Sequence, residues 1–133
     1  MKPKVLLIDD DFCALQVTAR YFRMTGWTVR TARDGKEGLR MAFTDRPDFV
    51  IVDYMMPVLN GHDFTVRLHA GPSTREVPVL MLSGRDLTPE LSALLERDSA
   101  FVGFLAKPAR FSEIEEKLRK TLKIAAMTDK ETP

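Results

Sequence analysis

Three consecutive aspartates, Asp9, Asp10 and Asp11, directly follow a short aliphatic run at residues 5–8. An uninterrupted aliphatic run of this length predicts a strand that is buried on both faces of a sheet. The three acids then lie at the C-terminal end of that strand, which is the edge where open α/β sheets place their ligand sites. Carboxylates crowded at one point need a positive counter-charge, so this feature predicts a cation site.

A second aliphatic run, at residues 49–52, ends in another acid, Asp53. If the two strands are neighbours in one parallel sheet, their acids converge at the same edge of that sheet. Clustered carboxylate oxygens are ligands of hard divalent cations, and Mg²⁺ is commonly held by one or two of them together with water. The two strand ends therefore predict a magnesium site.

Strand-like and helix-like segments alternate five times along the chain. We expect strands at residues 4–9, 28–31, 48–53, 78–82 and 102–105. We expect helices at residues 12–25, 35–43, 62–70, 89–98 and 111–125. Strict alternation of this kind predicts an α/β fold with a doubly wound, parallel sheet.

The last predicted helix has apolar residues at three- and four-residue spacings, which indicates one buried face. Its other face carries charged side chains that we expect to be exposed to water, namely Glu115, Glu116, Arg119, Lys120 and Lys123. Residues 1–125 are expected to form one domain, and the polar residues 126–133 to be a tail or a linker stub.

Composition limits the classes of function. With 133 residues, 44% of them hydrophobic, the chain is long enough for one domain with a sizeable core. Its 20 basic and 19 acidic residues give a net charge of +1, so we expect no direct binding to nucleic acid. Without a membrane-spanning apolar stretch or a signal peptide, no membrane insertion and a cytoplasmic location are expected. The single Cys13 excludes an intrachain disulfide and is expected to pack in the fold, while His62 and His69 are expected at the surface.

Two more predicted strands are followed by polar residues. Ser83 comes after the run at residues 79–82, and Lys107 comes after the run at residues 104–106. Taken alone, a hydroxyl after a strand is a common turn cap and a lysine is a common surface charge. Together with the carboxylates and a metal ion, they complete the set of groups that holds a phosphoryl group and neutralises its oxygens.

On these residues the chain resembles the receiver domains of two-component response regulators, over about residues 3 to 124. The matching segments are VLLIDDD at 5–11, DGKEGL at 34–39, PDFVIVDYMMPVLNG at 47–61, PVLMLSG at 78–84 and FLAKP at 104–108. The resemblance implies a flavodoxin-like sheet of five strands in the order 2-1-3-4-5, with five helices. It implies a phosphorylation-dependent signalling switch that is not an enzyme, beyond supporting its own phosphorylation and autodephosphorylation.

The resemblance also implies roles for the acids. Asp53 is the implied phosphoacceptor, which takes a phosphoryl group from a phosphohistidine of a sensor histidine kinase or of a phosphotransfer protein. Mg²⁺ is the implied cofactor, with Mn²⁺ as a substitute. The implied metal ligands are Asp10, Asp53, the backbone carbonyl of Met55 and, through a water molecule, Asp9. Asp11 is expected to lie outside this set as an acid at the start of a helix.

The remaining roles follow from the same resemblance. Ser83 is implied to bind a phosphoryl oxygen, and Lys107 is implied to be the counter-ion of the acyl phosphate, aimed by a cis bond to Pro108. Phosphorylation is implied to draw Ser83 inward and to let Phe104 rotate into the vacated space. That change alters the surface around the fourth and fifth helices, through which the chain would control an unidentified downstream protein.

The chain departs from the common family pattern at positions that affect the conformational switch and the lifetime of the phosphorylated state. Phe104 has no hydroxyl, so only packing can drive its rotation. Met55 and Arg85 are implied to flank the path by which water attacks the acyl phosphate. A thioether accepts hydrogen bonds weakly and a guanidinium accepts none, so neither side chain is suited to orient that water. We therefore expect slow autodephosphorylation.

Three other functions remain open at this point. A magnesium-dependent phosphatase of the haloacid dehalogenase type would use Asp9 as its nucleophile, but Cys13 departs from that pattern and no downstream acidic pair is evident. A flavodoxin-like cofactor binder would need a neutral, amide-rich phosphate loop in place of the acidic one. A receiver kept only as a phosphorylation-independent scaffold would leave the full set of chemical groups unexplained.

Overall fold

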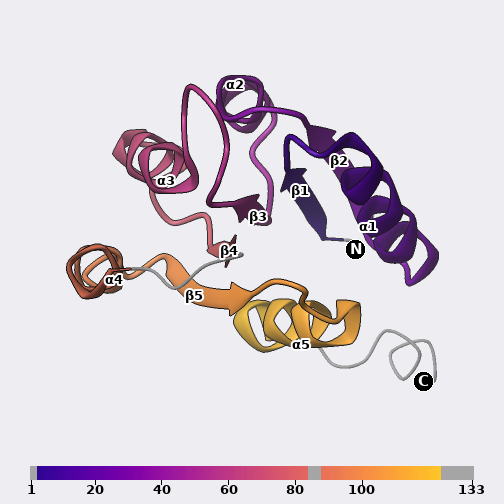
Figure 1. Cartoon of the computed structure of the whole chain (residues 1–133). Helices are drawn as coiled ribbons and strands as arrows, with labels where there is room; N and C mark the ends of the chain where they lie inside the picture. The colour runs from indigo at the N-terminus through magenta and orange to yellow at the C-terminus, as the bar shows by residue number, and fades with distance from the viewer. Residues whose placement is uncertain (1–2, 84–87, 124–133) are drawn as a thin grey trace.

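The computed structural model describes residues 3–83 and 88–123, in which five parallel strands alternate with five helices (Figure 1). The strands are β1 (Lys4–Ile8), β2 (Thr28–Ala32), β3 (Phe49–Asp53), β4 (Val79–Ser83) and β5 (Phe101–Ala106). The helices are α1 (Phe12–Met24), α2 (Gly35–Thr44), α3 (Gly61–Ala70), α4 (Pro89–Glu96) and α5 (Phe111–Leu122). The strands form one sheet in the order β2-β1-β3-β4-β5, which confirms the predicted fold and strand order. None of the helices in these ranges is long and apolar enough to cross a membrane.

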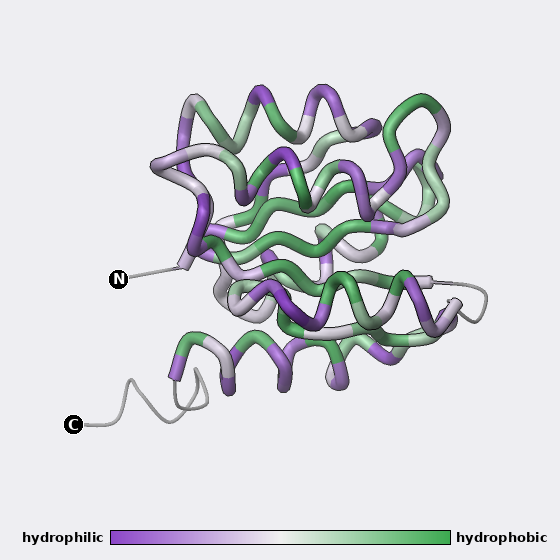
Figure 2. Tube along the Cα trace, turned by 90° about the vertical axis from the view of Figure 1, so that its left-hand side faces the viewer, coloured by the Kyte–Doolittle hydropathy of each residue, from purple (hydrophilic) through white to green (hydrophobic). Residues whose placement is uncertain are grey.

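Helices cover both faces of the sheet and bury two hydrophobic clusters. On one face α1 and α5 supply Phe22 and Leu118, and on the other face α3 supplies Phe64 and Leu68, all of them fully buried. Figure 2 shows the strands as hydrophobic stretches between the helices. Burying one such side chain contributes about 1.5–3 kcal/mol to folding. The core therefore lies on both faces of the central strands, whose ends carry the acids.

After Lys4 at its start, the strand that precedes the acids has only apolar positions, because both of its faces are buried. Leu6 and Ile8 point into one cluster, and Val5 and Leu7 point into the other. This alternation is the period of two of a β-strand. The first position beyond β1 that can carry a charge at low cost is therefore Asp9, where the chain leaves the sheet.

Side-chain caps start four of the helices. The capping residues are Asp11, Asp34, Asn60 and Thr88, and each accepts a hydrogen bond from the backbone N–H three residues further on. After α1 the chain turns through Gly26 with φ of 100°, a conformation that favours glycine. The predicted elements are confirmed with boundaries shifted by one or two residues. The exceptions are the predicted end of the last helix and the predicted tail at residues 126–133, which lie outside the described residues.

Glu115 on α5 was expected to be exposed, and that expectation is wrong. The residue is buried, with a relative exposure of 7%. Its carboxylate accepts hydrogen bonds from the Tyr21 hydroxyl at 2.8 Å, the Trp27 indole N–H at 2.8 Å and the Arg119 guanidinium at 2.9 Å. Burial raises the pKa of Tyr21, and the bond to Glu115 raises it further. The buried carboxylate thus joins α5 to α1 and to the residue before β2.

Two other sequence-based expectations are also wrong. Cys13 is exposed on the first turn of α1 instead of packed. His69 is not a surface histidine, because its side chain is only 8% exposed. One ring nitrogen of His69 contacts the Asp98 carboxylate and the other lies 2.7 Å from the Val77 carbonyl oxygen, so this side chain ties α3 to the turn before β5.

Candidate functional site

The ends of four neighbouring strands deliver the polar side chains of the site. Asp9 and Asp10 directly follow β1, and Asp53 is the last residue of β3, the strand paired with β1. Ser83 is the last residue of β4, and Lys107 directly follows β5. These four strands are parallel, and they are hydrogen-bonded to one another in the order β1, β3, β4 and β5. Their C-terminal ends therefore lie along one edge of the sheet. The residues predicted from strand ends are therefore brought to the same edge.

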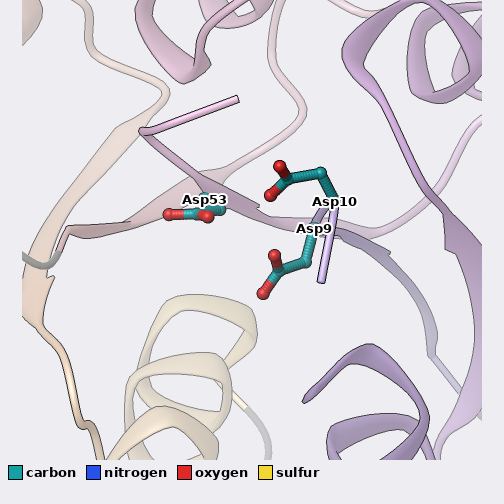
Figure 3. A group of neighbouring side chains, drawn as sticks. All are labelled: Asp9, Asp10 and Asp53. Carbon is teal, nitrogen blue, oxygen red and sulfur yellow. The ribbon is translucent and has the colours of Figure 1, made fainter. Parts of the chain in front are cut away.

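Asp9, Asp10 and Asp53 form a compact carboxylate cluster (Figure 3). One oxygen from each side chain lies within 4.8 Å of one from each of the others. The Asp53 side chain is 7% exposed and that of Asp9 is 15% exposed, whereas Asp10 is exposed at the mouth of the site. Three carboxylates at this spacing provide the hard oxygen ligands that Mg²⁺ prefers.

Lys107 is the positive group of the site. Its Nζ lies 3.1 Å from a carboxylate oxygen of Asp53 and 3.6 Å from one of Asp9. Burial lowers the pKa of Lys107, but its contacts with Asp53 and with Asp9 outweigh burial and the net pKa is raised. The ammonium therefore stays charged beside the buried carboxylate.

The surroundings of Asp9 disfavour its ionised form. Burial raises the pKa of Asp9 above its ordinary value, and the charges of Asp53 and Asp10 act in the same direction. The backbone N–H of Asp11, 3.0 Å from Asp9 Oδ1, and the Lys107 ammonium oppose this rise. The raised pKa means that the protein, mainly through burial, disfavours the ionised form of Asp9, and a bound cation would favour that form. The side chain of Asp11 caps α1 and is not part of the cluster, as expected.

The loop after β3 is held close to the carboxylates by backbone contacts. The Met55 N–H lies 3.4 Å from Asp53 Oδ1, and the Gly61 N–H donates to the Tyr54 carbonyl at 2.9 Å. A Cβ on Gly61 would lie 2.9 Å from the Asp53 carbonyl oxygen, so glycine is needed for α3 to start this close to the strand end. The Met55 side chain is 53% exposed. The Met55 backbone thus contacts the phosphoacceptor carboxylate expected from the sequence, while much of its side chain is open to water.

The other predicted residues are placed as follows. Ser83 is buried, and its carbonyl accepts a hydrogen bond from the Lys107 N–H at 2.8 Å. The Lys107–Pro108 bond is cis, as predicted. Phe104 is partly buried on β5, with its ring 4.8 Å from that of Phe101 in an edge-to-face arrangement. Arg85 lies outside the described residues.

The sequence reasoning missed a feature of the loop at residues 54–60. Val58 has φ of 70° and is 87% exposed. A β-branched residue in the left-handed region is a backbone outlier that costs on the order of 1–3 kcal/mol. No pattern in the sequence signals a positive φ at a valine, so this strain is visible only in the structure.

The chain belongs to the response regulator receiver domain family, whose profile matches residues 5–119. Members of this family generally accept a phosphoryl group and are not catalytic enzymes, and membership implies a histidine kinase as partner. The cluster of Asp9, Asp10 and Asp53 is typical of the magnesium and phosphoacceptor site of receiver domains.

The relatives of this chain include longer proteins. It is 33% identical to the response regulator MprA of Mycobacterium ulcerans over 98% of this chain and 55% of that protein. It is 36% identical to the transcriptional regulatory protein PrrA of Mycobacterium tuberculosis over 91% of this chain and 50% of that protein. The chain thus spans about half the length of these curated relatives.

Solved structures of similar proteins have nearly the same length as this chain. The chemotaxis protein CheY4 of Vibrio cholerae superposes with a TM-score of 0.77 at 32% identity, covering 92% of this chain and 98% of that one. The receiver domain of the Francisella response regulator 1452 superposes with a TM-score of 0.79 at 30% identity, again covering 92% of this chain and 98% of that one. These likenesses agree with the family assignment.

Proposed function

We propose that this chain is a phosphorylation-dependent switch in which Asp53 accepts a phosphoryl group from a phosphohistidine. The observation that carries the proposal is the Asp53 carboxylate, which is buried, lies 3.1 Å from the Lys107 ammonium and shares its pocket with Asp9 and Asp10. The donor would be a sensor histidine kinase or a phosphotransfer protein.

The donor set fits a hard divalent cation. Asp10, Asp53 and the Met55 carbonyl would hold Mg²⁺ or Mn²⁺ directly, and Asp9 would orient a water molecule on the ion. When bound, the ion would neutralise charge on the oxygens of the incoming phosphoryl group. Three carboxylates with one ammonium nearby would otherwise repel a phosphoryl group.

Asp53, Lys107 and Ser83 each have a separate role in phosphoryl transfer. An oxygen of Asp53 forms a bond to phosphorus while the bond from phosphorus to the histidine nitrogen breaks, and that nitrogen keeps the bonding electron pair. The Lys107 ammonium offsets negative charge on the equatorial oxygens. The Ser83 hydroxyl donates a hydrogen bond to one of these oxygens. The product is an aspartyl phosphate and an unphosphorylated donor.

Phosphorylation would change the surface that a downstream protein binds. Ser83 lies at the end of β4, and Phe104 lies on the adjacent strand and packs against the hydrophobic cluster that includes Leu95 of α4. Inward movement of the Ser83 hydroxyl would free space for Phe104 to rotate toward the core. The equilibrium between two packings would then shift, and with it the surface of α4, β5 and α5.

Labelling with acetyl phosphate tests the proposed function and its main alternative. We expect purified protein with Mg²⁺ to gain one phosphoryl group, measured by intact mass, and EDTA to prevent the gain. We expect negligible turnover of p-nitrophenyl phosphate, which a phosphatase using Asp9 would hydrolyse. Rapid turnover of that ester, or full labelling in the presence of EDTA, would count against the proposal.

We predict a long-lived aspartyl phosphate. Replacing Met55 with Asn and Arg85 with Glu introduces groups that can orient the attacking water. The double variant should lose its phosphoryl group about tenfold faster than the wild type, equivalent to about 1.4 kcal/mol of barrier. Phosphoryl loss in excess Mg²⁺ measures this. Val66→Asn with Arg67→Glu, two exposed positions on α3, is the matched control, and an equal or slower decay of the Met55 and Arg85 variant would contradict the prediction.

A further inference from the structure

The buried histidine His69 lies at the edge of the sheet opposite the carboxylate site. Its side chain is 8% exposed and adjoins Val77 just before β4 begins, whereas the carboxylates lie at the C-terminal ends of the strands. The ring Nδ1 contacts the Asp98 carboxylate, and the ring Nε2 lies 2.7 Å from the Val77 carbonyl oxygen. Both ring nitrogens therefore contact segments outside α3.

Both partners of the ring are hydrogen-bond acceptors. A backbone carbonyl cannot donate a hydrogen bond, and neither can an ionised carboxylate. Asp98 Oδ1 accepts from the Ala100 N–H at 3.0 Å, which favours the ionised carboxylate. A neutral imidazole has one N–H and one lone pair, so it satisfies one acceptor and turns its lone pair toward the other. Only the imidazolium, with an N–H on each nitrogen, satisfies both.

Asp98 joins the end of α4 to the start of β5. Its N–H donates to the Leu95 carbonyl at 3.0 Å, and its carbonyl accepts from the Phe101 N–H at 3.0 Å. Leu95 is the only buried residue among residues 89–96, which form α4. The contact between Asp98 and His69 is thus a second attachment of this end of α4 to the rest of the fold.

We propose that His69 and Asp98 form a pH-sensitive latch that holds the junction of α4 and β5 against α3. The latch is closed when the ring is an imidazolium and is weakened when the ring loses a proton. Histidine normally changes its charge between about pH 5 and 8. Loss of the proton removes the ion pair and leaves one acceptor without a donor. The junction lies at one end of the surface that phosphorylation is proposed to change, but the latch acts whether or not Asp53 is phosphorylated.

Asp98 dominates the electrostatic surroundings of the ring. The charged residues beside His69 or its partners along the chain are exposed and form no hydrogen bond or ion pair with the ring, namely Arg67, Arg75, Glu76 and Arg97. Water screens such exposed charges. Burial disfavours a charged ring, but a carboxylate and a carbonyl that both accept from it offset this cost. The folded protein therefore favours the imidazolium more than the unfolded chain does.

The sign of the pH dependence follows from this preference. Stability from the latch is fully present below the range in which the histidine of the unfolded chain titrates. It is lost as the pH rises through the range in which the folded ring titrates.

Nuclear magnetic resonance of the ring tests the latch directly. The chain has two histidines, so His62→Gln leaves His69 as the only source of imidazole signals. We expect the ring in the folded protein to release its second proton about one pH unit higher than the same ring in urea-unfolded protein. Asp98→Asn in the same background should abolish or reverse this difference, because a buried ring without a carboxylate partner is more stable as the neutral form.

Urea unfolding measures what the latch contributes to stability. His69→Gln should raise the unfolding equilibrium constant by about tenfold more at pH 5.5 than at pH 8. The carboxylates of the site are the same in both proteins, so their titration cancels. His62→Gln is the matched control, since that side chain is 24% exposed and pairs only with the adjacent Asp63, and its effect should be equal at both pH values. If His69→Gln does not fold, Asp98→Asn takes its place.

Two results would overturn the latch. One is a folded ring that releases its proton at the same pH as the unfolded ring, or at a lower pH. The other is an equal effect of His69→Gln at pH 5.5 and pH 8, which would assign His69 a packing role only. No phosphodonor enters these measurements, so their outcome does not bear on the proposed function, and a failure of labelling by acetyl phosphate does not bear on the latch.

Discussion

Replacing Lys107 with alanine is expected to slow labelling of Asp53 by acetyl phosphate by about 10²- to 10³-fold, the usual cost of removing one group that stabilises transition-state charge. The Lys107 ammonium lies 3.1 Å from the Asp53 carboxylate in a partly buried pocket, where screening by water is reduced. A bound cation would still assist the reaction, so the loss should be large but not complete.

The rate of mass gain at saturating Mg²⁺ measures this loss. Lys107→Arg keeps the charge but replaces a compact ammonium with a planar guanidinium, so its rate should fall between those of the wild type and the alanine variant. Lys117→Ala, on the exposed face of α5, is the control for removing a lysine. A Lys107→Ala rate within about threefold of the wild type would show that the ammonium has no part in the transfer.

Replacing Glu115 with alanine is expected to lower the free energy of unfolding by about 3–5 kcal/mol, the usual cost of removing one partner of a buried charged pair. The variant leaves the Tyr21 hydroxyl, the Trp27 indole N–H and the Arg119 guanidinium without their common acceptor. Because typical domains have only about 5–15 kcal/mol of stability, a loss of this size threatens folding itself.

Urea unfolding followed by circular dichroism measures the loss without relying on the fluorescence of Trp27, which contacts Glu115. Glu115→Gln retains an acceptor but not the charge opposite Arg119, so it should be less destabilising than alanine. Glu116→Ala is the matched control, since Glu116 is exposed and pairs loosely with Lys120 at 3.7 Å, and its cost should stay below about 1 kcal/mol. Similar costs for Glu115→Ala and Glu116→Ala would show that the buried network contributes little.

The fold could be predicted because aliphatic runs and amphipathic segments alternate without ambiguity and because capping residues mark the helix starts. The exposed face of α5 was harder to predict than the fold. A charged residue on a helix is usually exposed, and Glu115 is buried only because Tyr21 and Trp27, about ninety positions away along the chain, supply donors to it. Helical periodicity carries no information about partners so far away in sequence.

The site was predictable for a related reason. In a parallel sheet the C-terminal ends of the strands lie along one edge, so the sequence alone predicts that Asp9, Asp10, Asp53 and Lys107 lie together, as they do. The conformation of the loop after β3 was not predictable, because no residue pattern signals the positive φ of Val58. Such features come from backbone geometry and not from residue type.

The most direct measurement of whether Asp53 is the phosphoacceptor is to locate the phosphoryl group. Protein labelled with acetyl phosphate and Mg²⁺ is treated with borohydride, which reduces an aspartyl phosphate to homoserine, and its peptides are mapped by mass spectrometry. We expect homoserine at position 53 in the wild type and no labelling of Asp53→Asn. Homoserine at position 9 or 10, or undiminished labelling of Asp53→Asn, would contradict the assignment.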